Sequence, residues 1–236
     1  MTALTVRNLQ VSYSGVPAVA RYDVELQPGS LTVILGRNGA GKTSTLRGIV
    51  GFLPGETGRA TGEIELLGQV VKRPSPLALS RQGLCLISER NKVFTGVTVA
   101  DQLELISPNA RAQRRVLDIF PRLAERLDIR AGLLSGGERQ MLATALALLR
   151  EPKVLLVDEL SLGLAPAIVH ELMQRLRTLA DEQGLAILAA DQAVTASLKV
   201  ADVVQVMDDG EVVASGPIAD LDVETVLATY LGQETV

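Results

Sequence analysis

The chain has 236 residues, enough for one domain with a large core, and 47% of them are hydrophobic but only 3% aromatic. A formal net charge of −4 gives no general attraction to nucleic acid or anionic lipid, so we expect no nucleic-acid partner. The single cysteine, Cys85, excludes an internal disulfide framework and favours a reduced cytoplasmic setting. We find neither a signal peptide nor an apolar run of the roughly 18 residues that span a bilayer. We therefore expect another chain to hold the protein at any membrane where it works.

The first half of the chain contains two kinds of strand pattern. Residues 2–11 and 62–67 alternate in polarity, as antiparallel strands do. The apolar runs 31–35 and 84–87 lack this alternation, which is typical of parallel strands buried on both faces. A helical pattern at 43–50 follows the first of these runs.

The second half begins with a long helical stretch. Residues 99–150 are mostly helical in pattern and contain no obvious buried strand. Further apolar strands are expected at 154–157 and 186–190, with a helix at 166–183 between them. A strand, a turn and a strand follow at 203–214. Alternating strands and helices predict an α/β sheet that binds ligands at the carboxyl ends of its strands.

These elements predict a single α/β domain over residues 1–236. The core would consist of about residues 1–89 and 151–236 and would include the antiparallel β portion. We interpret about residues 90–150 as a helical subdomain inserted into this core.

A glycine-rich stretch between the strand at 31–35 and the helix at 43–50 fits the pattern G-x-x-x-x-G-K-[ST]. It consists of Gly36, Arg37, Asn38, Gly39, Ala40, Gly41, Lys42 and Thr43. The N–H groups of such a loop, with the positive end of the following helix dipole, cradle phosphates. We expect Lys42 to reach the β- and γ-phosphates and the Thr43 hydroxyl to bind Mg²⁺. A glycine-rich turn with a surface lysine is the alternative, and the flanking strand and helix count against it.

Two carboxylates, Asp158 and Glu159, end the apolar strand at 154–157. A buried strand that ends in acid needs a reason, because an unpaired buried charge is unfavourable. A Mg²⁺ ion near Thr43 supplies that reason for Asp158, and Glu159 would then polarise the attacking water. Apolar strands with acidic ends are common by themselves. Together with the phosphate loop, they predict a P-loop (RecA-like) nucleotidase.

The segment 134–140, Leu-Ser-Gly-Gly-Glu-Arg-Gln, resembles the signature motif of ABC ATPases. Ser135, Gly136, Gly137 and Glu138 would form an anion site at a helix N-terminus. In that family the signature site caps the γ-phosphate held by the phosphate loop of a second subunit. An ordinary capped helix start is the alternative interpretation of this segment alone.

The resemblance to ABC ATPases implies roles for four further positions. Tyr13 stands where the family has an aromatic residue that stacks on adenine, and residues 161–165 resemble the D-loop at the dimer interface. Glu89 takes the place of the usual Q-loop glutamine, where it can contact Mg²⁺ or water. Gln192 takes the place of the usual switch histidine. Since glutamine does not titrate near neutral pH, we expect Glu159 to carry more of the mechanism. The one histidine, His170, is expected to be an ordinary surface or packing residue.

Each ATP would therefore contact Tyr13 and the residues from Gly36 to Ser44 of one chain, and Ser135 to Glu138 of another. The resemblance implies Glu159, Lys42 and Gln192 as catalytic residues. It implies Thr43, Asp158 and Glu89 as contacts of Mg²⁺.

Two segments are similar to those of the ATP-binding subunits of branched-chain amino acid importers. These are residues 88–99, with glutamate at the Q-loop, and residues 158–166, although Leu160 stands where these proteins usually have proline. The resemblance implies a subunit that lies on the inner face of the cell membrane and powers amino acid import. Its partners would be membrane permease subunits, a second ATP-binding subunit that is identical or homologous and, indirectly, a solute-binding protein.

Two other functions stay open from the sequence. One is a non-transport ABC ATPase, such as a cluster-assembly factor. The other is a regulatory subunit that binds ATP without hydrolysing it, against which the presence of Lys42, Asp158 and Glu159 counts. Subunits related to those of the branched-chain amino acid importers also serve transporters of urea, amides and other small solutes, so the sequence leaves the cargo open.

Overall fold

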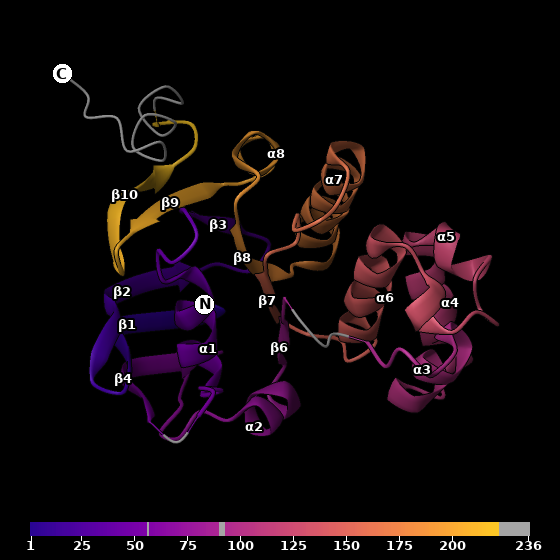
Figure 1. The fold of residues 1–236 in the computed structure, drawn as a ribbon, viewed down its shortest axis with the longest axis horizontal. Helices are drawn as coiled ribbons and strands as arrows, with labels where there is room; N and C mark the ends of the chain where they lie inside the picture. Colours follow the sequence, from indigo (N-terminus) through magenta and orange to yellow (C-terminus); the bar gives the residue numbers. More distant parts are fainter. Residues whose placement is uncertain (56, 90–92, 222–236) are drawn as a thin grey trace.

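The computed structural model describes residues 1–55, 57–89 and 93–221, and its strands form one ten-stranded sheet (Figure 1). The order across the sheet is β5 (Gln69–Val70), β4 (Gly58–Leu66), β1 (Leu4–Tyr13), β2 (Val16–Leu26), β10 (Glu211–Pro217), β9 (Val203–Asp208), β3 (Leu31–Leu35), β8 (Ala186–Asp191), β7 (Val154–Asp158) and β6 (Leu84–Ile87). The predicted α/β fold is therefore confirmed, including its antiparallel portion.

The parallel part of the sheet comprises β9, β3, β8, β7 and β6. All residues of β3, β7 and β8 are buried, as the apolar runs without alternation predicted. Leu35 of β3 lies opposite Asp191 of β8, and Asp158 of β7 lies opposite Ala190. The carboxyl ends of these three strands therefore lie side by side.

The antiparallel part comprises β1, β2, β4 and β5. Strands β1 and β4 were predicted, whereas β2 was not. Buried and more exposed residues alternate regularly only in the second half of β2, where Tyr22, Val24 and Leu26 are buried. One register pair, between Glu211 of β10 and Arg21 of β2, joins this part of the sheet to the rest.

Helices cover the sheet and form a separate group at one side of it (Figure 1). Their bounds are α1 (Lys42–Val50), α2 (Pro76–Arg81), α3 (Val99–Ile106), α4 (Ala110–Ile119), α5 (Pro121–Ala124), α6 (Gly136–Leu148), α7 (Pro166–Gln183) and α8 (Val194–Leu198), with a short 3₁₀ turn at Ala131–Leu133. The helices from α3 to α6 occupy the stretch where helices were predicted. Residues 90–92, at the predicted start of the helical subdomain, lie outside the described residues.

Side-chain caps fix where several of these helices begin. Thr98 accepts a hydrogen bond from the backbone N–H of Asp101 at 3.1 Å before α3. Asn109 accepts one from the N–H of Arg111 at 3.0 Å before α4. Such caps satisfy N–H groups that have no partner within the helix. Among the helices of the described residues, none is long and apolar enough to cross a membrane.

The core lies on both faces of the sheet because successive residues of each strand point to opposite faces. Val33 and Leu35 of β3 belong to one cluster, which includes the buried faces of α6 and α7. Ile34 belongs to the other cluster, with Leu46 and Ile49 of α1.

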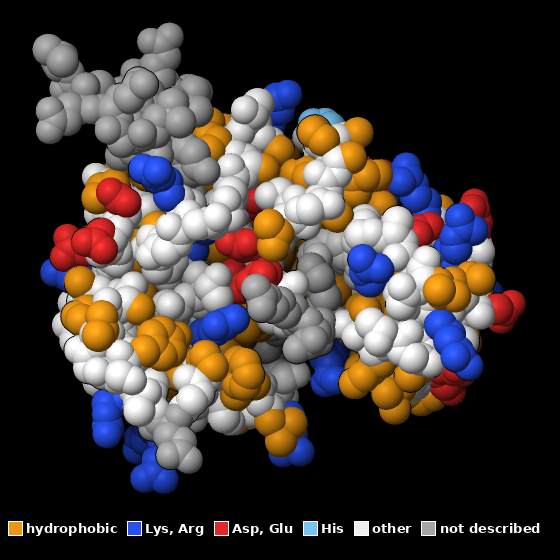
Figure 2. Space-filling model, viewed as in Figure 1, with side chains coloured by type: hydrophobic (Ala, Val, Ile, Leu, Met, Phe, Trp, Pro, Cys, Tyr) orange, Lys and Arg blue, Asp and Glu red, His pale blue; other side chains and the backbone are white. Residues whose placement is uncertain are grey.

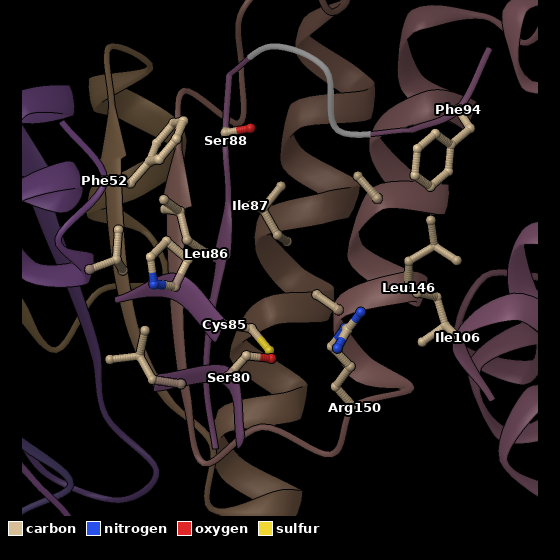
Figure 3. Close-up of a pocket in the computed structure, with 15 residues that line it drawn as sticks. Phe52, Ser80, Cys85, Leu86, Ile87, Ser88, Phe94, Ile106, Leu146 and Arg150 are labelled. Carbon is tan, nitrogen blue, oxygen red and sulfur yellow. The ribbon is translucent and has the colours of Figure 1, made fainter. Parts of the chain in front are cut away.

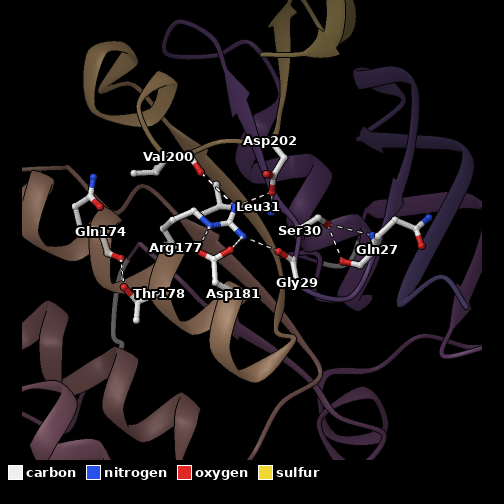
Figure 4. A network of polar contacts seen from close by, with 10 residues as sticks. All are labelled: Gln27, Gly29, Ser30, Leu31, Gln174, Arg177, Thr178, Asp181, Val200 and Asp202. Atoms are coloured by element: carbon white, nitrogen blue, oxygen red, sulfur yellow. Dashed lines mark hydrogen bonds and ion pairs between the residues drawn. The ribbon is translucent and has the colours of Figure 1, made fainter. Parts of the chain in front are cut away.

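Arg177 of α7 connects the helix to two segments that precede strands of the sheet (Figure 4). Its guanidinium donates to the carbonyl of Gly29 at 2.6 Å and to Asp202 Oδ2 at 2.6 Å, and it is paired with Asp181 at 2.7 Å. Asp202 also accepts a hydrogen bond from the N–H of Leu31 at 2.7 Å. These contacts fix the amino end of β3, opposite to the end where β3, β7 and β8 stop at polar loops.

Candidate functional site

The loop between β3 and α1 lies at the carboxyl end of the parallel sheet and is packed closely against its neighbours. A Cβ atom on Gly36 would lie 2.4 Å from the carbonyl oxygen of Met207 in β9. Gly41 has a φ of +105°, and a Cβ there would lie 2.6 Å from the carbonyl oxygen of Ala18. Only glycine fits either position. The loop can thus pass between β2 and β9 while Gly39, at its tip, faces open space.

Lys42 begins α1 and is almost fully buried beneath this loop, with 4% of its surface exposed. Its ammonium group donates to the carbonyl oxygens of Gly36, at 2.7 Å, and Arg37, at 3.1 Å. Burial lowers the pKa of Lys42, and the carboxylates of Glu159 and Asp158 oppose that shift. A cation is therefore held under the loop, where it can compensate phosphate charge.

Thr43 and Asp158 are brought together, as predicted. The Thr43 hydroxyl donates to Asp158 Oδ1 at 2.8 Å. Asp158 is 1% exposed, and burial raises its pKa. The hydrogen bond from Thr43 and the charge of Arg47 lower that pKa, whereas the nearby carboxylates of Glu159 and Glu89 raise it further.

The oxygen atoms of Thr43 and Asp158 suit Mg²⁺, an ion that proteins often hold together with substrate phosphates and water. Among the described residues, no group of three or more His, Cys, Asp or Glu side chains could hold a metal ion. Mg²⁺ usually takes one or two carboxylates together with substrate phosphates and water. The Thr43 hydroxyl and the buried Asp158 carboxylate match that requirement.

Gln192, directly after β8, connects two other predicted site residues. Its side-chain amide donates to Glu159 Oε1 at 2.9 Å and to Asn38 Oδ1 at 2.8 Å. Glu159 has a left-handed backbone conformation, with φ of 49°, and its N–H donates to the carbonyl of Ala190 at 2.8 Å. A glutamate in this conformation is uncommon and requires support from its surroundings. Glu159 thus leaves the line of β7 and reaches the phosphate loop through Gln192.

The signature residues form a second group with other neighbours. Ser135 and Glu138 form a capping box: the Glu138 N–H donates to the Ser135 hydroxyl at 3.2 Å, and the Ser135 N–H donates to the Glu138 carboxylate at 2.8 Å. The hydrogen bond from the Ser135 N–H lowers the pKa of Glu138, and Arg126 adds to this effect. A Cβ on Gly137 would lie 2.8 Å from Ile168 of α7. The start of α6 is thus packed against α7.

The remaining predicted residues are less closely connected to these groups. Tyr13, at the end of β1, is half-buried against the core, and its hydroxyl is buried without a hydrogen-bond partner in the described part of the chain. Arg37 is exposed, Ser44 is half-buried, and His170 is exposed on α7. Figure 2 shows acidic side chains near the centre of one face, between the antiparallel strands and the helices from α3 to α6.

A family profile described as ABC transporter matches residues 19–161, which is more than half of the chain. The chain belongs to the ABC transporter ATP-binding family. This ABC subunit therefore binds and hydrolyses ATP, and subunits of this family work with membrane permeases. Of the functions left open by the sequence, the comparisons favour the transporter over the non-transport and the regulatory alternatives.

Several relatives resemble this ABC subunit over most of their length. The high-affinity branched-chain amino acid transport ATP-binding protein BraG of Pseudomonas aeruginosa is 33% identical, over 89% of this chain and 91% of that protein. The lipopolysaccharide export system ATP-binding protein LptB of Escherichia coli is 30% identical, over 99% of both chains. A solved ATP-binding cassette of an ABC transporter has the same fold, with a TM-score of 0.86 and 21% identity over the full length of both chains.

One residue of the site received no role from the sequence. Asp191 ends β8 and is completely buried, and it accepts hydrogen bonds from the loops after β7 and β8. The signal was present, because the apolar run 186–190 ends in an acid just as the strand before Asp158 does. The sequence explains the acid at Asp158 through a metal near Thr43, whereas the hydrogen-bond donors around Asp191 come from loops that no sequence pattern brings together.

Proposed function

We propose that this ABC subunit powers the import of branched-chain or other amino acids. The main support for this proposal is the similarity of the chain to three branched-chain amino acid transport ATP-binding proteins, at 28–33% identity. Two sequence features favour the same group, namely Glu89 in place of the Q-loop glutamine and Gln192 in place of the switch histidine. Export proteins for lipopolysaccharide and Nod factor are similar at 30% and 32% identity, so direction and cargo need direct measurement.

In the proposed mechanism, ATP lies along the phosphate loop from Gly36 to Ser44, and Tyr13 stacks on the adenine. The Lys42 ammonium group, which lies beneath the loop, compensates the charge of the β- and γ-phosphates. Glu159 orients the water that attacks the γ-phosphate and accepts its proton. Gln192 holds the Glu159 carboxylate and can donate a hydrogen bond near the γ-phosphate.

Thr43 and Asp158, with Glu89 beside them, would hold Mg²⁺ in this proposal. The ion, when bound, neutralises charge on the β- and γ-phosphates. The burial of Asp158, which is 1% exposed, and its contact with the Thr43 hydroxyl support this assignment, because a buried carboxylate gains from a nearby cation.

A second ATP-binding subunit, identical or homologous, would complete each site. The residues of the phosphate loop pack against β2 and β9, whereas Gly136 packs against Leu164 in the loop before α7 and Gly137 against Ile168 of α7. Ser135, the two glycines and Glu138 would therefore cap the ATP that is bound by the partner chain.

A permease would contact an apolar cavity of about 440 Å³ beside β6, between α2 and α6 (Figure 3). Phe52 and Phe94 at its edge are 55% and 61% exposed, although large apolar side chains favour burial. Phe94 lies in the segment 89–98, where the resemblance to ABC ATPases implies the contact with a permease helix; residues 90–92 of that segment lie outside the described residues. This contact would hold the subunit on the inner face of the cell membrane, and a solute-binding protein would act through the permease.

We also propose that the chain works as one nucleotide-binding domain, with a core of about residues 1–89 and 151–236 and a helical subdomain of about residues 90–150. The continuous ten-stranded sheet and the grouping of α3 to α6 support this division.

The proposal is tested by purifying the tagged chain from native membranes and identifying its partners by mass spectrometry. The recovered complex is then placed in proteoliposomes, and uptake of labelled leucine is measured with ATP on the side of this subunit. We expect a permease and a second ATP-binding subunit, and ATP-dependent uptake. ATP-driven movement in the opposite direction, or recovery of soluble partners only, would contradict import.

The control for that experiment is Lys42→Ala, which we expect to abolish nucleotide binding and uptake. The reason is the loss of the only phosphate-loop ammonium group. Retained binding of a fluorescent ATP analogue by this variant would show that the loop is not the nucleotide site.

A further inference from the structure

Asp191 is a buried carboxylate that the mechanism above does not use. It is completely inaccessible, at 0% exposure. Its Oδ1 accepts hydrogen bonds from the N–H of Gln192 at 2.6 Å, from the N–H of Ala193 at 3.0 Å, and from the Ser161 hydroxyl. Its Oδ2 accepts one from the N–H of Ser161 at 3.2 Å. Burying a carboxylate is unfavourable unless hydrogen-bond donors compensate for its lost hydration. The donors from Ser161, Gln192 and Ala193 therefore stay close to Asp191 as one network.

These donors come from two loops that carry the residues proposed for hydrolysis. Ser161 lies two residues after Glu159, in the loop after β7. Gln192 lies directly after β8, which is the neighbour of β7 in the sheet. A hydrogen bond of 2.8 Å from the Glu159 N–H to the carbonyl of Ala190 joins the same two strand ends. Asp191 therefore fixes the loops on either side of the contact between Gln192 and Glu159.

Such support matters for Gln192 because its side chain is long and can rotate about three bonds. Its amide lies 2.9 Å from the Glu159 carboxylate and 2.8 Å from Asn38. The contact with Glu159 requires that the backbone at Gln192 keeps its position relative to the loop after β7, and the contact with Asn38 requires the same relative to the phosphate loop. A misplacement of about 1 Å at a reacting group can lower a rate roughly a hundredfold.

We propose that Asp191 is a positioning residue for ATP hydrolysis. By joining Ser161 to the backbone of Gln192 and Ala193, it holds the Gln192 amide against the Glu159 carboxylate. The inference rests on the proposed roles of Glu159 and Gln192 in hydrolysis.

The cleanest test changes Ser161 and leaves the carboxylate in place. Asp191 also contributes negative charge near Lys42, and so its own replacement can affect ATP affinity directly. Ser161→Ala removes one donor to Asp191 without a change of charge, and Ser161→Thr keeps the hydroxyl. We expect Ser161→Ala to lower kcat by roughly tenfold with little change in the KM for ATP, and Ser161→Thr to restore most of kcat.

Asp191→Asn is the second variant, with Asp202→Asn as its matched control. An amide at position 191 would place a donor against the Ser161 N–H or against the Gln192 and Ala193 N–H groups, so we expect kcat to fall by roughly ten- to a hundredfold. Asp202 also accepts a backbone N–H, that of Leu31, but at the other end of β3. Asp202→Asn should lower thermal stability and leave kcat unchanged at a temperature well below unfolding.

A double variant shows whether Asp191 acts through Gln192. If it does, Gln192→Ala with Ser161→Ala should have the same kcat as Gln192→Ala alone, because the positioned group is absent. Three results would each overturn the inference. The first is a double variant whose loss of kcat is the product of the two single losses. The others are an unchanged kcat in Ser161→Ala and a kcat in Ser161→Thr as low as in Ser161→Ala. If Glu159→Gln and Gln192→Ala both keep wild-type turnover, the proposed mechanism itself is wrong. If those two variants lose turnover while Ser161→Ala and Asp191→Asn do not, only the role of Asp191 fails.

Discussion

Glu159 is the residue whose chemistry the proposal depends on most. It accepts a hydrogen bond from Gln192 at 2.9 Å and leaves β7 through a left-handed backbone conformation, which directs it away from the strand. Glu159→Gln keeps the size of the side chain and removes its basicity. We expect ATP binding to persist and phosphate release to fall by roughly 10²- to 10³-fold.

The measurement for Glu159→Gln pairs a phosphate-release assay with binding of a fluorescent ATP analogue. Glu182→Gln, at an exposed position near the end of α7, makes the same change away from the site and should keep wild-type turnover. Wild-type turnover in Glu159→Gln would remove the catalytic assignment.

Glu138 is a second single residue with a testable effect, in this case on how stability depends on pH. Its folded pKa is lowered, first by the hydrogen bond from the Ser135 N–H and also by Arg126. A depressed pKa means that the stabilisation is present above the unfolded pKa of about 4.3 and is lost as pH falls through the lowered folded value. We expect Glu138→Gln to lower the free energy of unfolding by about 1 kcal/mol at pH 7, and the difference to shrink below about pH 4. Urea unfolding of both proteins between pH 3 and pH 7 measures this, and a difference that does not depend on pH would contradict it.

At the scale of elements, the packing of α6 against α7 depends on Gly137. A Cβ there would lie 2.8 Å from Cγ2 of Ile168, which is closer than such atoms approach in proteins. Gly137→Ala should therefore shift the start of α6 and lower stability by about 1–3 kcal/mol. Gly96→Ala is the matched control, because a Cβ on Gly96 meets no atom within 4 Å.

The clash can be separated from other effects by a compensating change. Ile168→Ala removes the atom that the new Cβ would meet, so the double variant with Gly137→Ala should be more stable than the two single losses predict. Thermal unfolding of the four proteins gives the interaction energy. Strict additivity would show that contact with Ile168 is not the reason for glycine at this position.

At the scale of the whole molecule, Arg177 joins α7 to the loops before β3 and β9. Its side chain is 17% exposed, and its partners Asp181 and Asp202 are 62% and 51% exposed, so solvent weakens the ion pairs. We expect Arg177→Met to lower the free energy of unfolding by about 1–3 kcal/mol, mainly through the lost hydrogen bond to the Gly29 carbonyl and the unpaired acids. Turnover well below the unfolding temperature should be unchanged, since these contacts lie at the other end of β3 from the phosphate loop.

Arg7→Met is the comparison for that variant. Arg7 pairs with Glu25 at 3.2 Å on the surface, where both side chains are more than half exposed, at 53% and 56%. Its loss should change stability by less than about 0.5 kcal/mol. Equal losses in the two variants would mean that the Arg177 network adds nothing beyond a surface ion pair.

Local sequence patterns were enough to predict most of the parallel strands, the phosphate-loop motif and the family. Each of these rests on local chemistry: continuous apolar runs for strands buried on both faces, and fixed spacings of glycine, lysine and hydroxyl for phosphates. The sequence does not predict β2, because its first half, Val16 to Ala20, contains Pro17 and is apolar without alternation, so that polarity alternates only from Arg21 onward.

Which distant residues meet at the site follows from the tertiary structure and not from any sequence pattern. Lys42 lies beneath its own loop, Gln192 reaches Glu159 across 33 positions of sequence, and Asp191 joins Ser161 to the end of β8. The physical reason is the order of the sheet, which places β8 between β3 and β7 and so brings three separate strand ends together. Strand order is set by how whole faces pack, and no local pattern in the chain specifies it.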